Sequence, residues 1–324
     1  MSKPENPQFQ PLQQQAYPSQ DDEIDLRELA RAIWQGKWLI LCITAIFAVS
    51  SVFYALSIPD EYKSTAILAP ASTSSSSSLS KLAGQFGGLA SLAGVNLGGG
   101  GGADKTTIAI ELMKTWGFLE TFIKSNQLEV EVFAAKGWDK ANNRLIIDSE
   151  LYDGTNKKWV REIDPSSGRK AEPSSWELFE KIKNKISISS DTKTGLVSLN
   201  VEHYSPFIAK KWADLLIVAI NQHMQLQDRK EALSSIEYLK TQINKTNIAE
   251  MRTIFYQLIE EQTKTLMLAE ISDEYVFKTL SPAKVAEQKS KPKRASIVVV
   301  GIMMGGMLSM MFVLIRYFTA NKKK

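Results

Sequence analysis

Two long apolar runs, one near each end of the chain, constrain the fold more than any other feature. Residues 38–58 and 295–315 each contain 21 amino acids without a charged side chain. At a rise of about 1.5 Å per residue, each run makes a helix of about 31 Å, close to the thickness of the hydrocarbon core of a bilayer. The second run also lacks the polar stripe that a helix packed on a soluble core needs. The sequence therefore predicts two transmembrane helices.

Two spans place both ends of the chain on one side of the membrane and the long middle segment on the other. The middle segment is long enough to bury a hydrophobic core. The predicted organisation is an N-terminal segment at 1–37, spans at 38–58 and 295–315, a middle domain at 59–294 and a tail at 316–324.

The basic residues around the first span predict its orientation. Arg27, Arg31 and Lys37 precede it, whereas only Lys63 follows closely. The positive-inside rule then puts the N-terminus in the cytoplasm. The second span has basic residues on both sides, but the rule weakens after a long translocated segment. We therefore expect both termini in the cytoplasm and the middle domain in the periplasm. We interpret the basic cluster before the second span as an anchor to anionic lipid headgroups.

Charge and cysteine content exclude several classes of function. The chain has 39 Lys and Arg against 35 Asp and Glu, so it lacks the basic excess of a nucleic-acid-binding protein. Cys42 is the only cysteine and lies in the first span, which rules out a disulfide within the chain and a site built on several thiolates.

Motifs for catalysis are also missing from the sequence. His203 and His223 fall on different predicted elements, and neither belongs to an HExxH motif. A G-x-S-x-G motif is absent as well. We expect no catalytic, cofactor or metal site, and we do not expect an enzyme. A carboxylate pair for glycan hydrolysis stays open, because such pairs have no sequence signature.

Local patterns in the middle domain alternate between strands and short helices. A β-prone run at 62–69 follows the first span, and 186–190 and 196–201 form the clearest hairpin, with a turn at 191–195. Residues 1–20 and the Gly/Ser-rich segment 71–102 are expected to be disordered or flexible. The remaining predictions are an amphipathic helix at 21–36, helices at 106–125, 128–134 and 174–185, a weak hairpin or a loop at 142–165 and a strand at 275–280.

The longest periodic region predicts a helical hairpin at about 206–271. Pro206 opens it, and Ile236, Leu239 and Ile243 follow the 3-4 spacing of a coiled-coil seam. Asn244-Lys245-Thr246-Asn247 interrupts the period, so we place a turn there. One unbroken helix is the alternative. The predicted fold class is α+β: two transmembrane helices flank an α/β base domain from which a long helical hairpin protrudes.

The second span carries small residues at intervals of four. Gly301, Gly305 and Ser309 share one helix face, and Gly306 follows directly after Gly305. Small residues let a second helix approach closely in a membrane. We predict that these four positions pack against another helix. That helix could come from the first span, a neighbouring subunit or another membrane protein.

Sequence blocks at the two ends of the chain resemble the Wzz family of polysaccharide chain-length determinants, or co-polymerases. At the start these are Glu23-Ile24-Asp25-Leu26, Trp34-Gln35-Gly36-Lys37 and the run Tyr62–Leu68. Near the end they are Ser281-Pro282, Pro292, Arg294-Ala295 and Gly305-Gly306-Met307. Pro282, Pro292 and Arg294 match the juxtamembrane motif, although Val285-Ala286 stands where the family usually carries a further proline. The middle of the chain matches only in outline.

The resemblance implies a function without catalysis. Wzz proteins form homo-oligomeric rings in the bacterial inner membrane and act with a Wzy-type polymerase on a growing lipid-linked polysaccharide. The first hypothesis is a regulator of lipopolysaccharide O-antigen length. The second is a co-polymerase for capsule or exopolysaccharide that works with a separate cytoplasmic tyrosine kinase, because the nine-residue tail has no room for a fused one. A periplasmic glycan-cleaving enzyme is the third.

Overall fold

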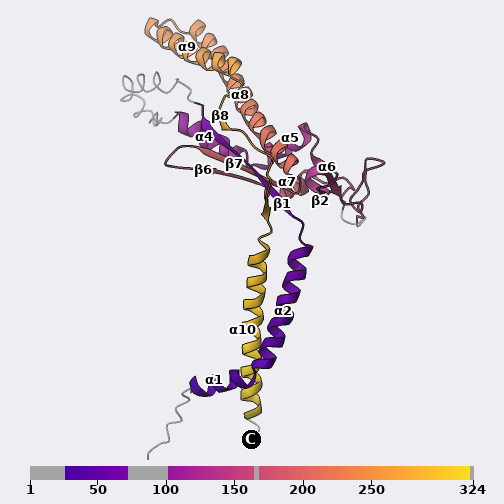
Figure 1. The fold of residues 1–324 in the computed structure, drawn as a ribbon. Helices are drawn as coiled ribbons and strands as arrows, with labels where there is room; N and C mark the ends of the chain where they lie inside the picture. The colour runs from indigo at the N-terminus through magenta and orange to yellow at the C-terminus, as the bar shows by residue number, and fades with distance from the viewer. Residues whose placement is uncertain (1–25, 72–100, 164–167, 322–324) are drawn as a thin grey trace, which may run out of the picture. The chain divides into compact units, whose positions relative to one another are not determined.

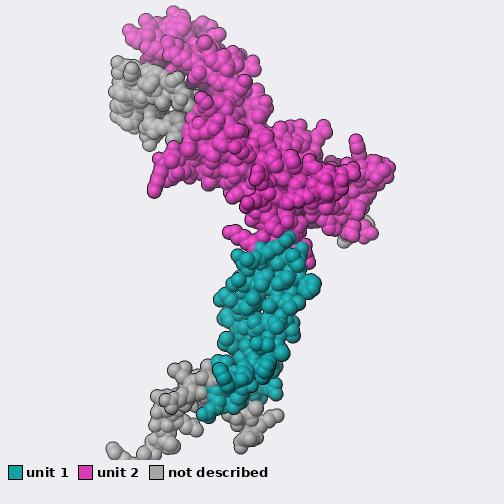
Figure 2. Space-filling model, in the orientation of Figure 1, with its two compact units in different colours: residues 1–56, 294–324 teal, residues 57–293 magenta. Residues whose placement is uncertain are grey.

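The computed structural model describes residues 26–71, 101–163 and 168–321, and it divides into two compact units (Figures 1 and 2). One unit comprises 1–56 and 294–324, and the other comprises 57–293. The expectations for residues 1–20 and for most of the segment 71–102 lie outside the described residues. The mixture of helices and sheet confirms the predicted α+β class.

In its described part, the first unit contains three helices: α1 (Leu26–Gln35), α2 (Lys37–Ser57) and α10 (Arg294–Asn321). Two segments, Lys37–Ser57 and Arg294–Thr319, are long and apolar enough to cross a membrane. The hydroxyls of Ser51 and Ser309 donate hydrogen bonds of 2.8 Å to carbonyls three residues earlier in their own helices. Such bonds satisfy polar groups where water is absent.

A five-stranded antiparallel sheet organises the second unit. Its strands are β1 (Glu61–Pro70), β6 (Ile186–Ser190), β7 (Val197–His203), β8 (Phe277–Ser281) and β9 (Lys289–Lys291). The order is β6-β7-β1-β8, and β9 pairs with the start of β1, where Tyr62 faces Lys289. The strand β9 was not predicted, because three residues reading Lys-Ser-Lys carry no apolar alternation.

Alternating side chains on β7 and β1 bury one face of this sheet. Val197, Leu199 and Val201 are fully buried, and Ala66 and Leu68 of β1 are fully buried with them. This face packs against the first half of α8 (Pro206–Lys245), which contacts both strands. The period of two along β7 therefore fixes which face of the sheet receives the long helix.

The helix predicted at 106–125 is broken in the structure. It forms two helices, α4 (Gly101–Leu112) and α5 (Trp116–Ser125). Thr115 has an extended backbone, and its side chain accepts a hydrogen bond from the N–H of Phe118, so it caps the second helix. The prediction of one helix was wrong because apolar periodicity continues across a cap. The helices α6 (Glu129–Phe133) and α7 (Ser175–Ile182) follow.

The hairpin or loop predicted at 142–165 is only partly right, because a hairpin does form around Asp153-Gly154 but Leu145–Ile147 does not belong to it. The structure has two hairpins there: β2 (Ala135–Asp139) pairs with β3 (Arg144–Ile147), and β4 (Tyr152–Asp153) pairs with β5 (Lys158–Trp159). The apolar residues of β3 thus pair backwards with β2 rather than forwards with Trp159.

The long helical hairpin is present. The helix α8 ends at Lys245, and α9 (Ala249–Ile271) packs back along it (Figure 1). Thr246 and Ile248 have extended backbones and bracket the turn. The alternative of one unbroken helix is therefore wrong.

Candidate functional site

Gly301 and Gly305 of α10 face α2 at close range. A Cβ atom added to Gly301 would lie 2.5 Å from the Cβ of Ser51. One added to Gly305 would lie 2.6 Å from the Cβ of Phe47. Both distances are too short for any side chain larger than hydrogen, so the contact requires glycine. In this unit the helix facing Gly301 and Gly305 is the first span of the same chain.

The other small residues of α10 differ from one another in their surroundings. Ser309 is completely buried. Gly306 has no atom within 4 Å of the place where a Cβ would stand, so its predicted packing role has no partner within the described residues.

Gly36, between α1 and α2, makes a further close contact that the pattern of small residues in the second span does not include. A Cβ at this position would lie 2.4 Å from Cγ1 of Val313 on α10. The only signal in the sequence was a glycine where the amphipathic helix meets the first span.

The juxtamembrane motif residues lie in a segment that runs along β1. Pro282 follows β8 and is exposed, whereas the next residue, Ala283, is buried. The hydroxyl of Ser64 donates a 2.7 Å hydrogen bond to the carbonyl of Lys284. Pro292 follows a cis peptide bond just after β9. The two prolines therefore bracket a stretch that is tied to β1 at both ends.

Arg294 begins α10 in the first unit. Its Nε atom donates a 3.1 Å hydrogen bond to the carbonyl of Ala55, close to the end of α2. The last carbonyls of a helix have no partner within that helix, so a cation is favourable there. Arg294 thus joins the end of one apolar helix to the beginning of the other.

A buried asparagine joins α8 to β8 in the second unit. Asn221 is 3% exposed. Its Oδ1 atom accepts hydrogen bonds from the backbone N–H groups of Val276 (2.8 Å) and Phe277 (2.9 Å), and its Nδ2 atom donates one to the carbonyl of Phe277 (3.1 Å). Sequence reasoning missed it, since one asparagine in a long helix has no pattern.

A second polar cluster lies two turns further along α8. Asp228 accepts hydrogen bonds of 2.6 Å from Nζ of Lys105 and from the hydroxyl of Tyr275. Burial and the neighbouring carboxylate raise the pKa of Tyr275, so the phenol stays protonated and keeps donating. Together with Asn221, this cluster fixes where the hairpin leaves the sheet. We call Asn221, Asp228, Lys105 and Tyr275 the joint.

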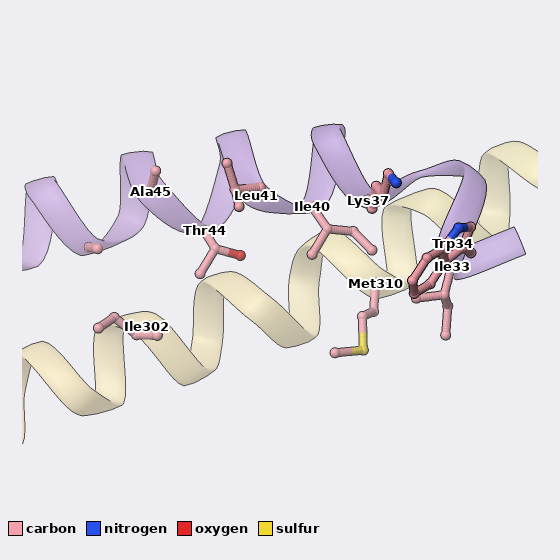
Figure 3. Close-up of a pocket in the computed structure, with 10 residues that line it drawn as sticks. Ile33, Trp34, Lys37, Ile40, Leu41, Thr44, Ala45, Ile302 and Met310 are labelled. Carbon is pink, nitrogen blue, oxygen red and sulfur yellow. The ribbon is translucent and has the colours of Figure 1, made fainter. Parts of the chain in front are cut away.

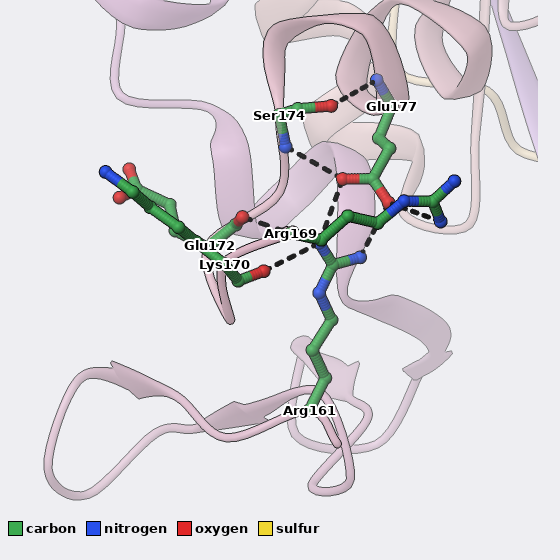
Figure 4. Close-up of polar contacts among 6 residues, drawn as sticks. All are labelled: Arg161, Arg169, Lys170, Glu172, Ser174 and Glu177. Carbon is green, nitrogen blue, oxygen red and sulfur yellow. Dashed lines mark hydrogen bonds and ion pairs between the residues drawn. The ribbon is translucent and has the colours of Figure 1, made fainter. Parts of the chain in front are cut away.

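An ion pair closes the loop before α7 (Figure 4). Arg161 donates two hydrogen bonds of 2.9 Å to the two carboxylate oxygens of Glu177, and a third to the carbonyl of Lys170 (3.0 Å). Glu177 also accepts from the N–H of Ser174, whose hydroxyl caps the helix in return. Mainly through the bonds from Arg161, the pKa of Glu177 falls to about 2. This is a structural clamp, because the Glu177 carboxylate and both terminal nitrogens of Arg161 bond within the fold. The buried Nε of Arg161 has no hydrogen-bond partner among the described residues.

The two histidines make different kinds of contact. His203 is 3% exposed, its Nδ1 accepts from the N–H of Ser205, and burial lowers its pKa to about 4, so it is neutral. His223 packs edge-on against Phe118. Within 26–71, 101–163 and 168–321, no group of three or more His, Cys, Asp or Glu residues could hold a metal ion.

Two family models match the chain. The model of the Wzz chain length determinant protein covers residues 22–125, and the GNVR model, a G-rich domain on putative tyrosine kinase, covers residues 245–318. The first contains α1, α2 and β1, and the second contains α9, the proline-bracketed segment and most of α10. Together they include every residue that carried the resemblance seen in the sequence.

Solved structures give weaker similarity. A full-length bacterial polysaccharide co-polymerase is 14% identical, with 92% of this chain and 99% of that chain covered and a TM-score of 0.38. A fragment of WzzB, a polysaccharide co-polymerase from Salmonella Typhimurium, is 12% identical, with 72% and 100% covered and a TM-score of 0.29. No curated protein sequence matches the chain.

Proposed function

The chain is a member of the Wzz family of chain length determinants, and we propose that it sets the modal length of lipopolysaccharide O-antigen in the bacterial inner membrane. The observation that carries this proposal is the match of the Wzz model to residues 22–125, which include the first apolar helix and the strand that follows it. Two helices able to cross a membrane support a membrane protein with two spans. In this proposal both termini are cytoplasmic and the second unit is periplasmic.

The protein acts without catalysing a reaction in this proposal. A Wzy-type polymerase adds the repeat units, and this chain determines how many are added before transfer. The polar groups described above support a scaffold: Asn221, Asp228, Arg161 and Glu177 all bond to groups inside the fold. Each holds one element against another, which is what a fixed framework for a polymerase requires.

Self-association is part of the proposal. The outer part of the hairpin exposes large apolar side chains over both helices, and Leu226 (61%), Tyr238 (63%) and Tyr256 (60%) are among the most exposed. Exposed apolar surface of this extent marks interaction sites. Further copies of this chain, arranged as a ring, would cover these side chains.

One observation favours a second candidate. The GNVR model, described as a G-rich domain on putative tyrosine kinase, covers residues 245–318. The chain would then be a co-polymerase for capsule or exopolysaccharide, and a separate tyrosine kinase in the cytoplasm would work with it. A kinase gene beside this gene would support this candidate.

A polysaccharide gel tests both candidates. The strain that carries this gene is compared with its deletion strain and with the deletion strain complemented by the gene. If the proposal is right, deletion changes a clustered lipopolysaccharide ladder into a steadily decaying one, and the gene restores the cluster. An unchanged ladder with loss of capsule or secreted polysaccharide would favour the second candidate. No change in any polysaccharide would contradict both.

A further inference from the structure

An apolar groove runs along α2 in the first unit (Figure 3). Trp34 and Lys37 lie at one end of it, and Ile302 and Met310 of α10 form its far wall. Ala48, the lining residue farthest along α2, marks the other end. Its volume is about 540 Å³. Nearly all the groups that line it are apolar, and the hydroxyl of Thr44, which also lines it, has no hydrogen-bond partner within the described residues. We call this feature the α2 groove.

The α2 groove has a positive charge at one end only. The Nζ atom of Lys37 lies 4.9 Å from the centre of the Trp34 ring. Among the side chains that the structure describes, which in this unit begin at Arg31, no carboxylate pairs with Lys37. Tryptophan and lysine at the end of a membrane helix mark the level of the lipid headgroups. The charged end of the groove therefore lies where phosphate groups are found.

The length of the groove matches one leaflet of a bilayer. From Lys37 to Ala48, eleven residues of helix span about 16 Å. Half of a hydrocarbon core of about 30 Å is about 15 Å. A lipid with its phosphate beside Lys37 would thus extend one acyl chain along the whole groove.

The charge at one end of the groove selects its occupant. Lys37 favours an anionic headgroup, and the apolar side chains that line the rest of the groove favour an acyl chain. An anionic lipid carries both groups in one molecule.

We propose that the α2 groove binds one acyl chain of an anionic phospholipid, whose phosphate lies against Lys37. The lipid covers apolar side chains of α2 beside the place where α2 packs on α10. It thereby occupies a defined site on the helix pair and stays there longer than a lipid of the surrounding bilayer does. This inference does not depend on which polysaccharide, if any, the protein regulates.

Photo-crosslinking of the full chain in lipid nanodiscs tests the proposal. The nanodiscs contain phosphatidylcholine and a small share of phosphatidylglycerol with a photoreactive acyl chain, and labelled peptides are mapped by mass spectrometry. We expect labelling of the peptides that line the groove. Unlabelled phosphatidylglycerol should compete for the site, whereas added phosphatidylcholine should not.

Substitutions within one turn of α2 provide matched variants. Ala45→Trp fills the groove and should reduce its labelling about tenfold, equivalent to about 1.4 kcal/mol. Ile46→Trp is the control, because Ile46 is 64% exposed and does not line the groove. At the charged end, Lys37→Gln should abolish the preference for phosphatidylglycerol, and Lys37→Arg should keep it.

Three results would overturn the proposal. Equal labelling of the wild type and Ala45→Trp would mean that the lipid only surrounds the helices without a defined site. Cross-links from the groove to a second copy or to another protein would mean that a protein fills it. Equal competition by both lipids, unaffected by Lys37→Gln, would show that the site does not select an anionic headgroup.

Discussion

The inner and outer halves of α8 are parts of one helix, yet the chain covers them very differently. Between Pro206 and Met224, apolar side chains at helical spacing are buried against the sheet and its neighbouring helices. Beyond Leu226, only Ala232, Leu239 and Ile243 of α8 are buried. The chain itself thus covers most of the apolar side chains of the inner half, whereas most of those in the outer half stay exposed.

This difference assigns separate roles to the two halves. The joint holds the inner half at a fixed position on the sheet, through hydrogen bonds that water cannot easily replace. The outer half keeps its apolar side chains on the surface, where only a partner can cover them. Stability should therefore reside in the inner half, and assembly in the outer half. The helix α10 shows the same contrast on a smaller scale, between covered Gly301 and open Gly306.

The largest expected effect comes from removing leucine side chains in the two halves. Leu216 is fully buried, and Leu216→Ala should lower the free energy of unfolding of the second unit by about 2–5 kcal/mol through the cavity it leaves. Leu226 is 61% exposed, and Leu226→Ala should change it by less than about 0.5 kcal/mol. Denaturant unfolding of the purified full chain measures both. Similar losses of unfolding free energy in the two variants would contradict the proposed difference between the inner and outer halves of α8.

Removal of the buried amide should be nearly as costly. Asn221→Ala leaves two backbone N–H groups and one carbonyl without partners, and we expect a loss of about 2–4 kcal/mol in the same unfolding experiment. Asn244→Ala is the control, because Asn244 is exposed near the tip of the same helix. A loss under about 1 kcal/mol for Asn221→Ala would show that the joint does not fix the hairpin.

The glycines of α10 provide the next test. Gly301→Leu forces a side chain into Ser51 and should destabilise the α2–α10 pair by about 1–3 kcal/mol, whereas Gly306→Leu points into open space. Fluorescence energy transfer between labels on the two helices in nanodiscs would report their separation. Equal effects of the two substitutions would mean that the contact with α2 does not depend on Gly301.

A pH titration compares the clamp in the base with an ion pair on the outer hairpin. The pKa of Glu177 is about 2 in the folded chain, below its ordinary value of 4.5. The ionised Glu177 therefore contributes about 1–3 kcal/mol to the free energy of unfolding above pH 4.5, and this contribution is lost as the pH falls towards 2. Arg161→Gln should remove this contribution near neutral pH and make less difference in acid.

The matched variant for the clamp is Lys264→Gln. Lys264 pairs with Glu260 on α9, and both side chains are more than half exposed. We expect no measurable change in the pH dependence of unfolding from this variant. If both variants changed the pH dependence of the unfolding free energy equally, the titrating group would not be Glu177.

The smallest effect on stability should come from the outer surface itself. Tyr238 is 63% exposed, so Tyr238→Glu should leave the unfolding free energy within about 0.5 kcal/mol of the wild type. Size measurements by light scattering in detergent should nevertheless show smaller assemblies, because the charge opposes burial between copies. Assemblies of unchanged size would remove Tyr238 from the proposed contact.

Periodic features could be predicted from the sequence, but tertiary polar contacts could not. The apolar runs, the β6–β7 hairpin and the interrupted period near Asn244 are local patterns, and each predicted its element. The break at Thr115 was missed because a cap depends on one hydroxyl. Asn221 and Gly36 were missed because their partners lie far away in the sequence, at Phe277 and Val313. The strand β9 depends on pairing with β1 alone.

The most direct test of the central claim is the length distribution of surface polysaccharide made with matched hairpin variants. A deletion strain would express the wild type, Tyr238→Glu or the neutral control Asn244→Ala, each at equal protein levels. The account predicts clustered chain lengths with the wild type and the control, and a decaying ladder with Tyr238→Glu. A wild-type chain that leaves the distribution unclustered, or a Tyr238→Glu chain that clusters it normally, would contradict the account.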